Sequence, residues 1–113
     1  MTPPTHGRAL ADLPGSNTGE GAEEIFERLA GREGVTIERI VSHGHHSPEG
    51  FWYDQEQSEW VMVLQGRAVL EIEGRDEPLH LEPGDWVDLP AHCRHRVVST
   101  DHHQPTVWLA VHY

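Results

Sequence analysis

The chain contains no lysine, so its eight basic residues are all arginines, set against 19 acidic side chains. A protein without lysine cannot form the lysine Schiff bases that some enzymes use with carbonyl substrates. The formal net charge of −11 would repel the phosphates of a nucleic acid, so we expect no nucleic-acid partner.

Cysteine and long apolar runs are equally scarce. Cys93 is the single cysteine, which excludes an intramolecular disulfide. No apolar run approaches the roughly 18–20 residues that span a bilayer, and the N-terminal residues lack a signal-peptide core. Neither G-x-G-x-x-G nor G-x-x-x-x-G-K occurs, so no nucleotide cofactor is expected. These absences predict a cytoplasmic protein with no membrane partner.

The first 30 residues divide into an arm and a short amphipathic segment. Residues 1–20 are rich in Pro, Gly, Ser and Thr, which predicts a flexible N-terminal arm. Four apolar residues then recur at helical spacing: Ala22, Ile25, Phe26 and Leu29. This spacing predicts a short helix over residues 21–30, ended by the glycines that follow.

From residue 35 the hydrophobic period changes to two, the period of half-buried strands. The predicted strands are 35–42, 51–55, 59–65, 67–73, 79–82, 86–90, 95–99 and 106–113. Short strands at this spacing, separated by Gly and Pro turns, indicate an all-β antiparallel sandwich or barrel. The arm therefore precedes a single domain over 21–113, with its strands in 35–113.

Ten histidines are many for a chain of this length. The stretch 42–66, SHGHHSPEGFWYDQEQSEWVMVLQG, offers two candidate sites. One is the local pattern His43-x-His45-x3-Glu49, whose residue types suit a metal ion. The other centres on Glu59, which opens a strand ending at Gly66.

Two spaced motifs resemble the cupin family. E59-WVMVLQ-G66 is similar to the second half of the first cupin motif, and G84-DWVDL-P90-A-H92-CR-H95 is similar to the second motif. The resemblance implies an antiparallel jelly-roll β-barrel over 35–113 with a pocket inside it, and a homodimer. It also implies a divalent metal in the pocket, which in cupins is typically Fe, Mn, Zn or Ni.

The motif positions carry over with one departure. Glu59 takes the position of the ligand glutamate and His95 that of the second-motif histidine. The paired histidines of the first motif should lie where this chain has Tyr53 and Gln55, or Trp52 and Asp54. The resemblance thus implies metal ligands Glu59 and His95, completed by an oxygen of Gln55.

Other residues extend this site. Asp54 or His92 could supply a further ligand, because His92 precedes His95 by three residues in a tight turn. His95 and Tyr53 are the candidates to move a proton during catalysis. Trp52, Tyr53 and His92 are expected to line the pocket. His112, on the last strand, is expected on a sheet surface or at an interface.

The local His43–Glu49 pattern lacks the strand and glycine that should follow it. Pro48-Glu49-Gly50 instead resembles the turn that precedes the ligand strand in cupins. His43, His45 and His46 then lie at a strand end near the rim. Two interpretations stay open: solvent-exposed loop residues, or a histidine that reaches the site from the rim.

Three functions are compatible with these residues. The first is a metal-dependent cupin that acts on a small polar molecule by dioxygenase, isomerase or lyase chemistry. The second is a metal-free cupin that binds or senses a small-molecule ligand without catalysis. The third is a structural role through dimerisation. The sequence does not decide whether the protein is an enzyme, because a shared fold does not fix the chemistry.

Overall fold

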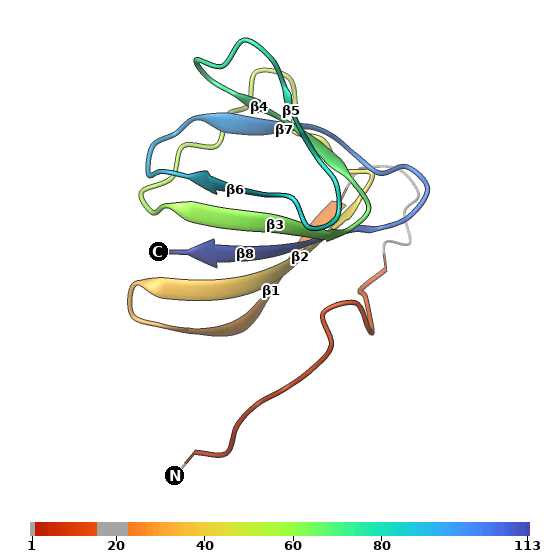
Figure 1. The fold of residues 1–113 in the computed structure, drawn as a ribbon, viewed down its shortest axis with the longest axis vertical. Coiled ribbons are helices and arrows are strands. Elements are labelled where there is room, and N and C mark those ends of the chain that lie inside the picture. Colours follow the sequence, from red (N-terminus) through yellow and green to blue (C-terminus); the bar gives the residue numbers. More distant parts are fainter. Residues whose placement is uncertain (1, 16–22) are drawn as a thin grey trace.

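The computed structural model describes residues 2–15 and 23–113, and its regular elements are all β-strands (Figure 1). A five-stranded sheet has the order β1-β2-β8-β3-β6. Its strands are β1 (Glu23–Arg32), β2 (Val35–His43), β8 (Thr106–His112), β3 (Glu59–Gln65) and β6 (Trp86–Leu89). A three-stranded sheet, β5-β4-β7, comprises β5 (Leu79–Leu81), β4 (Ala68–Ile72) and β7 (His95–Thr100).

The strand pairs within both sheets are antiparallel, as the alternating pattern predicted. Figure 1 shows the three-stranded sheet lying across from β3, β8 and β6. The part of the chain that the structure describes contains no helix long and apolar enough to cross a membrane.

The predicted helix over 21–30 is wrong. Glu23–Arg32 forms β1, which pairs with β2 from Glu23↔His43 to Arg32↔Val35. Gly34, at φ +81°, makes the turn between the two strands. A helix of about ten residues is marginal in water, whereas this hairpin gives the same backbone groups a long ladder of partners. Residues 21 and 22 of the prediction lie outside the described residues.

The core lies between the two sheets. Val61 and Val63 of β3 pack with Trp108 and Ala110 of β8, and β4 contributes Leu70, all at most 5 % exposed. These residues alternate along their strands, and cross-strand partners such as Val61↔Ala110 put their side chains on the same face. Burial of this face orients every other residue of β3 and β8 inward.

The predicted strand over 51–55 is mostly irregular. Tyr53 forms an isolated bridge to His95, with Tyr53 N donating to His95 O over 2.7 Å and His95 N to Tyr53 O over 3.2 Å. This bridge fixes the Tyr53 backbone to the first residue of β7.

The described part of the arm, residues 2–15, contains no strand or helix. Arg39 of β2 holds it: Nη1 donates to Ala11 O over 2.8 Å and to Ala9 O over 3.3 Å. His43 Nε2 lies 2.7 Å from Pro14 O. The predicted boundary at residue 20 lies outside the described residues, and the arm's flexibility stays a prediction.

Candidate functional site

A small cavity lies between the two sheets. Its wall includes polar side chains from five segments and apolar ones from the core: Glu24, Phe26, Ile40, Tyr53, Gln55, Glu59, Val61, Leu70, Leu89, His95, Trp108 and His112. The centres of water molecules can occupy about 50 Å³ of it. One water needs about 10–15 Å³ on this measure, so the cavity can hold a few waters or a comparably small group.

Glu59 is a buried carboxylate of the cavity. It is the first residue of β3, in register with Leu89 on β6 and His112 on β8. Its side chain is only 10 % exposed, and it accepts no hydrogen bond within the described part of the chain. Burial raises the pKa of Glu59, and the negative charges of Glu24 and Glu38 add to this rise, while His112 and His95 oppose it.

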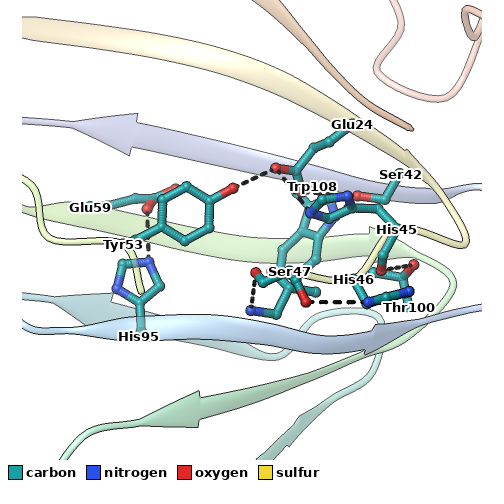
Figure 2. Close-up of polar contacts among 11 residues, drawn as sticks. Glu24, Ser42, His45, His46, Ser47, Tyr53, Glu59, His95, Thr100 and Trp108 are labelled. Atoms are coloured by element: carbon teal, nitrogen blue, oxygen red, sulfur yellow. Dashed lines mark hydrogen bonds and ion pairs between the residues drawn. The ribbon is translucent and has the colours of Figure 1, made fainter. Parts of the chain in front are cut away.

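His95 faces Glu59 from β7, with Nε2 3.8 Å from Glu59 Oε1 (Figure 2). His95 Nδ1 lies 2.9 Å from Cys93 O, which can only accept a hydrogen bond. Nδ1 therefore carries the proton and donates to Cys93. In the neutral ring this leaves a lone pair on Nε2, on the side of Glu59.

His112 flanks Glu59 on the other side, with Nε2 4.0 Å from Glu59 Oε2. The same nitrogen lies 2.8 Å from Glu38 Oε1, so it is committed as a donor to Glu38. His112 was expected on a sheet surface or at an interface, but it lines the cavity, because Glu59 and His112 are cross-strand partners and share the inner face.

Tyr53 and Glu24 form a second polar pair. The Tyr53 hydroxyl donates to Glu24 Oε1 over 3.0 Å, and the Tyr53 ring stacks on His95 at 5.2 Å between centroids. Burial first, and then the charge of Glu24, raises the pKa of Tyr53 well above its ordinary value. The phenol therefore stays protonated and is a donor at neutral pH.

A short hydrogen-bond network holds Glu24 in place (Figure 2). Trp108 Nε1 donates to Ser42 Oγ over 3.0 Å, and Ser42 Oγ donates to Glu24 Oε2 over 3.3 Å. His45 Nε2 lies 3.8 Å from Glu24 Oε1. These contacts tie the second carboxylate of the cavity to the buried core.

Four of the predicted site residues surround this one cavity, and three lie elsewhere. Glu59, His95, Gln55 and Tyr53 line it. His92 is exposed at φ +65°, and its Nδ1 lies 2.8 Å from Asp54 Oδ1 at the surface. Trp52 lies beneath the Arg94 guanidinium, 5.4 Å from the ring centroid, and does not line the cavity.

The three clustered histidines take different positions. His46 is exposed, and the His43 ring contacts the arm through Pro14. His45 is mostly buried beside Glu24, so its imidazole lies next to a cavity-lining carboxylate without lining the cavity itself. Of the two open interpretations, His45 therefore resembles the second and His46 the first.

The donor set fits a tightly held metal ion incompletely. Glu59 and the Nε2 lone pair of His95 face each other, but His112 Nε2 is engaged by Glu38 and the Tyr53 hydroxyl by Glu24. Catalytic metal sites usually take three protein ligands. In residues 2–15 and 23–113, no group of three or more His, Cys, Asp or Glu side chains is arranged to hold an ion.

Sequence reasoning missed Glu24 and His112. Glu24 was assigned to a helix, although Glu24 and Phe26 alternate with Ile25 as residues of a strand do. For His112, the signal was the alternation of β8, in which it shares a face with the buried Trp108 and Ala110.

Solved structures and a family profile place this geometry in context. A crystal structure from Ralstonia eutropha, of a protein provisionally named a mannose-6-phosphate isomerase, is 54 % identical, with a TM-score of 0.90. The match covers 96 % of this chain and 97 % of that one. No curated protein matches the sequence.

More distant structures show the same fold. A cupin superfamily protein of Desulfitobacterium hafniense is 20 % identical with a TM-score of 0.71, covering 97 % of this chain and 92 % of its own. The EutQ protein of Clostridium difficile is 15 % identical with a TM-score of 0.66, covering 87 % and 74 %. The profile of the cupin domain matches residues 38–112, and the chain therefore belongs to the cupin family.

Proposed function

We propose that the cavity binds a small polar molecule through its hydrogen-bond donors and catalyses a proton transfer on it, as an isomerase does. The observation that carries this proposal is the pair formed by Glu59 and His95. The Glu59 carboxylate is nine-tenths buried and accepts no hydrogen bond from the described residues, and it faces the Nε2 lone pair of His95 at 3.8 Å.

Two acceptors that face each other across a cavity suit a ligand that carries hydrogen-bond donors. Two hydroxyl groups of a ligand, or one ammonium group, would supply hydrogens to both atoms. We therefore propose that the ligand carries such donors. We also propose, from the cupin family, that the two sheets close as a barrel around the ligand.

The raised pKa of Glu59 suits it to the role of general base, because a base is most effective when its pKa approaches the working pH. With a hydroxy carbonyl compound, Glu59 would remove the proton from the hydroxyl-bearing carbon, and the C–H electrons would form an enediolate. The same carboxyl group would then return the proton to the neighbouring carbon.

The oxygen atoms need a separate proton transfer. His95 Nε2 would accept the proton of the substrate hydroxyl and deliver it to the former carbonyl oxygen. Tyr53, which stays protonated, would donate a hydrogen bond to the enediolate after releasing Glu24. The net result is a hydrogen moved from carbon to carbon and another from oxygen to oxygen.

The 54 % identity to a protein provisionally named an isomerase supports this class of reaction. A metal at Glu59, His95 and Gln55 stays a prediction from the family resemblance, and the incomplete donor set argues against it. Elemental analysis of untagged protein should then give far less than one Fe, Mn, Zn or Ni per chain. Stoichiometric metal would overturn the metal-free form of the proposal.

Exchange of carbon-bound hydrogen tests the proton transfer directly. Wild-type protein in D₂O should wash deuterium into the α position of dihydroxyacetone, as measured by NMR. Glu59→Gln should slow this exchange by about 10²–10⁴-fold, the usual contribution of a general base. Glu56→Gln, three residues away and exposed, is the matched control. Equal exchange with and without protein would refute the proposal.

Two further proposals are the homodimer, which rests on the family resemblance, and the cytoplasmic location, which rests on the absence of a signal-peptide core and of a long apolar run in the sequence. Sedimentation at micromolar concentration tests the dimer, and a single monomeric species would remove it.

A further inference from the structure

From the charge of the cavity wall, we infer that the site accepts uncharged or cationic polar molecules and rejects phosphorylated ones. This inference rests on the proposed function in one respect, that the cavity between the sheets is the ligand site. It makes the phosphorylated sugar in the name of the Ralstonia relative an unsuitable substrate for this chain.

Among the residues that the structure describes, the cavity wall carries carboxylates and no guanidinium. Glu24 and Glu59 line it, and Glu38 lies directly behind His112. No arginine is among the described residues that line the cavity, and the chain has no lysine to replace one. A phosphate dianion placed there would meet negative charge on two sides in a partly desolvated space, where screening by water is weak.

The arginines nearest to these segments are committed elsewhere. Arg39 holds the carbonyls of the arm and pairs with Glu27 at 2.7 Å. Arg96 Nη2 donates to Ser47 O over 3.1 Å. Neither of these two arginines is among the described residues that line the cavity.

The imidazoles do not reverse this charge. His95 directs its Nδ1 proton to Cys93 O and a lone pair toward the cavity, and His112 donates to Glu38. Phosphate sites in proteins are built from backbone N–H groups, helix N-termini and arginines. The polar atoms of Glu59 and His95 that face the cavity are acceptors, so a phosphate, itself an acceptor, finds no partner in that pair.

The small volume supports the same conclusion. Water centres occupy about 50 Å³, which is room for a few waters and hence for a triose-sized part of a ligand. Phe26 is 52 % exposed and lines the cavity, so it lies where the cavity meets solvent. A bulky charged group would have to remain outside, next to Phe26 and Glu24.

The affinities of two ligands that differ only in a phosphate group test the inference, and this measurement does not depend on whether the protein catalyses a reaction. Dihydroxyacetone and dihydroxyacetone phosphate would be titrated into protein labelled with ¹⁵N at histidine, and the imidazole resonances would be followed by NMR. We expect dihydroxyacetone to shift the resonances of His95 with saturation. The phosphate should bind at least about tenfold more weakly, because one repulsive pair of charges is worth about that factor.

A cationic side chain at position 26, where the cavity meets solvent, should reverse the preference for the uncharged ligand. Phe26→Arg should strengthen phosphate binding by about tenfold relative to Phe26→Gln, which opens the same space without a charge. Equal or tighter binding of the phosphate by wild-type protein would overturn the inference, and so would the absence of binding by either ligand. If dihydroxyacetone binds but its α hydrogen does not exchange, the charge preference stands and the proton-transfer proposal fails.

Discussion

Glu59 shows how one residue links the fold to its stability as well as to its site. A folded-state pKa above the unfolded value means that the folded protein retains a proton on Glu59 after the unfolded chain has released it. The free energy of unfolding must then fall as the pH rises above the ordinary carboxyl value of 4.5 toward the raised folded value.

We predict that Glu59→Gln removes this decline. The variant should gain stability relative to wild type as the pH rises through the window above 4.5, because glutamine cannot ionise in the buried site. Urea unfolding of both proteins from pH 5 to pH 8 measures the difference. Two parallel curves would show that Glu59 titrates alike in the folded and unfolded chains.

Gly66 is the second residue with a specific structural demand. Its φ of +79° disfavours other residues, and an added Cβ would lie 2.7 Å from Thr106 Oγ1 and 2.9 Å from Thr106 Cα. Thr106 cannot retreat, because it is fully buried and its hydroxyl donates to Arg67 O and accepts from Asp101 N.

Gly66→Ala should therefore destabilise the protein by about 3 kcal/mol or more, through strain and overlap together. Gly74→Ala is the matched control, because Gly74 has a φ of +88° with nothing within 4 Å of the added Cβ. Gly74→Ala should lower the free energy of unfolding by only about 1–2 kcal/mol, which is the backbone strain of a positive φ without any overlap. Thermal unfolding compares the two, and equal losses would contradict the predicted overlap.

At the level of elements, the contact between β2 and the arm rests mainly on Arg39. Arg39 as a whole is only 8 % exposed. Its guanidinium donates hydrogen bonds to the carbonyls of Ala9 and Ala11 and forms an ion pair with Glu27. A buried cation of this kind replaces the backbone hydrogen bonds that an irregular segment cannot make for itself.

Arg39→Met should free the arm and cost about 1–3 kcal/mol, the value of hydrogen bonds to a charged group. Trypsin should then cut after the exposed Arg8 several times faster than in wild type, as mass spectrometry would detect. Glu27→Gln removes the ion pair but leaves the bonds to the arm, so its cleavage should stay close to wild type. Unchanged cleavage in Arg39→Met would show that other contacts hold the arm.

β1 shows where local pattern and tertiary pairing disagree. The apolar residues of 22–29 fit a helical period, yet the chain forms a strand because β2 offers an unpaired edge directly after the Gly34 turn. Local propensity is a weak preference, and the hydrogen bonds of a long hairpin outweigh it. Because residues 21–30 were predicted as a helix, Glu24 was not recognised as a residue of the cavity.

For the whole molecule, the dominant electrostatic property is the net charge of −11. With 19 acidic side chains and eight arginines on a chain of 113 residues, the mean interaction between charges is repulsive, and compaction increases it.

We expect the melting temperature to rise by a few degrees between 20 mM and 0.5 M NaCl, since salt screens the repulsion that opposes folding. KCl should give the same increase, because the effect depends on ionic strength rather than on the particular cation. A melting temperature that is flat or falls with salt would mean that attractive ion pairs, such as Arg39–Glu27, outweigh the net repulsion.

Much of the fold followed from the sequence alone. The alternation of Val35 and Ile37 with Thr36 and Glu38, and the Gly and Pro turns between short runs, predicted an all-β antiparallel fold and most of its strands. Two motifs, ending at Gly66 and His95, identified the cupin family. These features are local, so the order of residues is sufficient to reveal them.

Only the tertiary structure decided which residues meet in the cavity. Glu59 and His112 lie more than 50 residues apart in the chain and become neighbours through the pairing of β3 with β8. Glu24 reaches the same cavity because β1 extends the sheet beyond β2. The sequence determined most of the strands and the identity of Glu59 and His95. Strand order and register assembled the cavity lined by Glu24, Glu59 and His95, because a single residue of slip would turn every inward side chain to the other face.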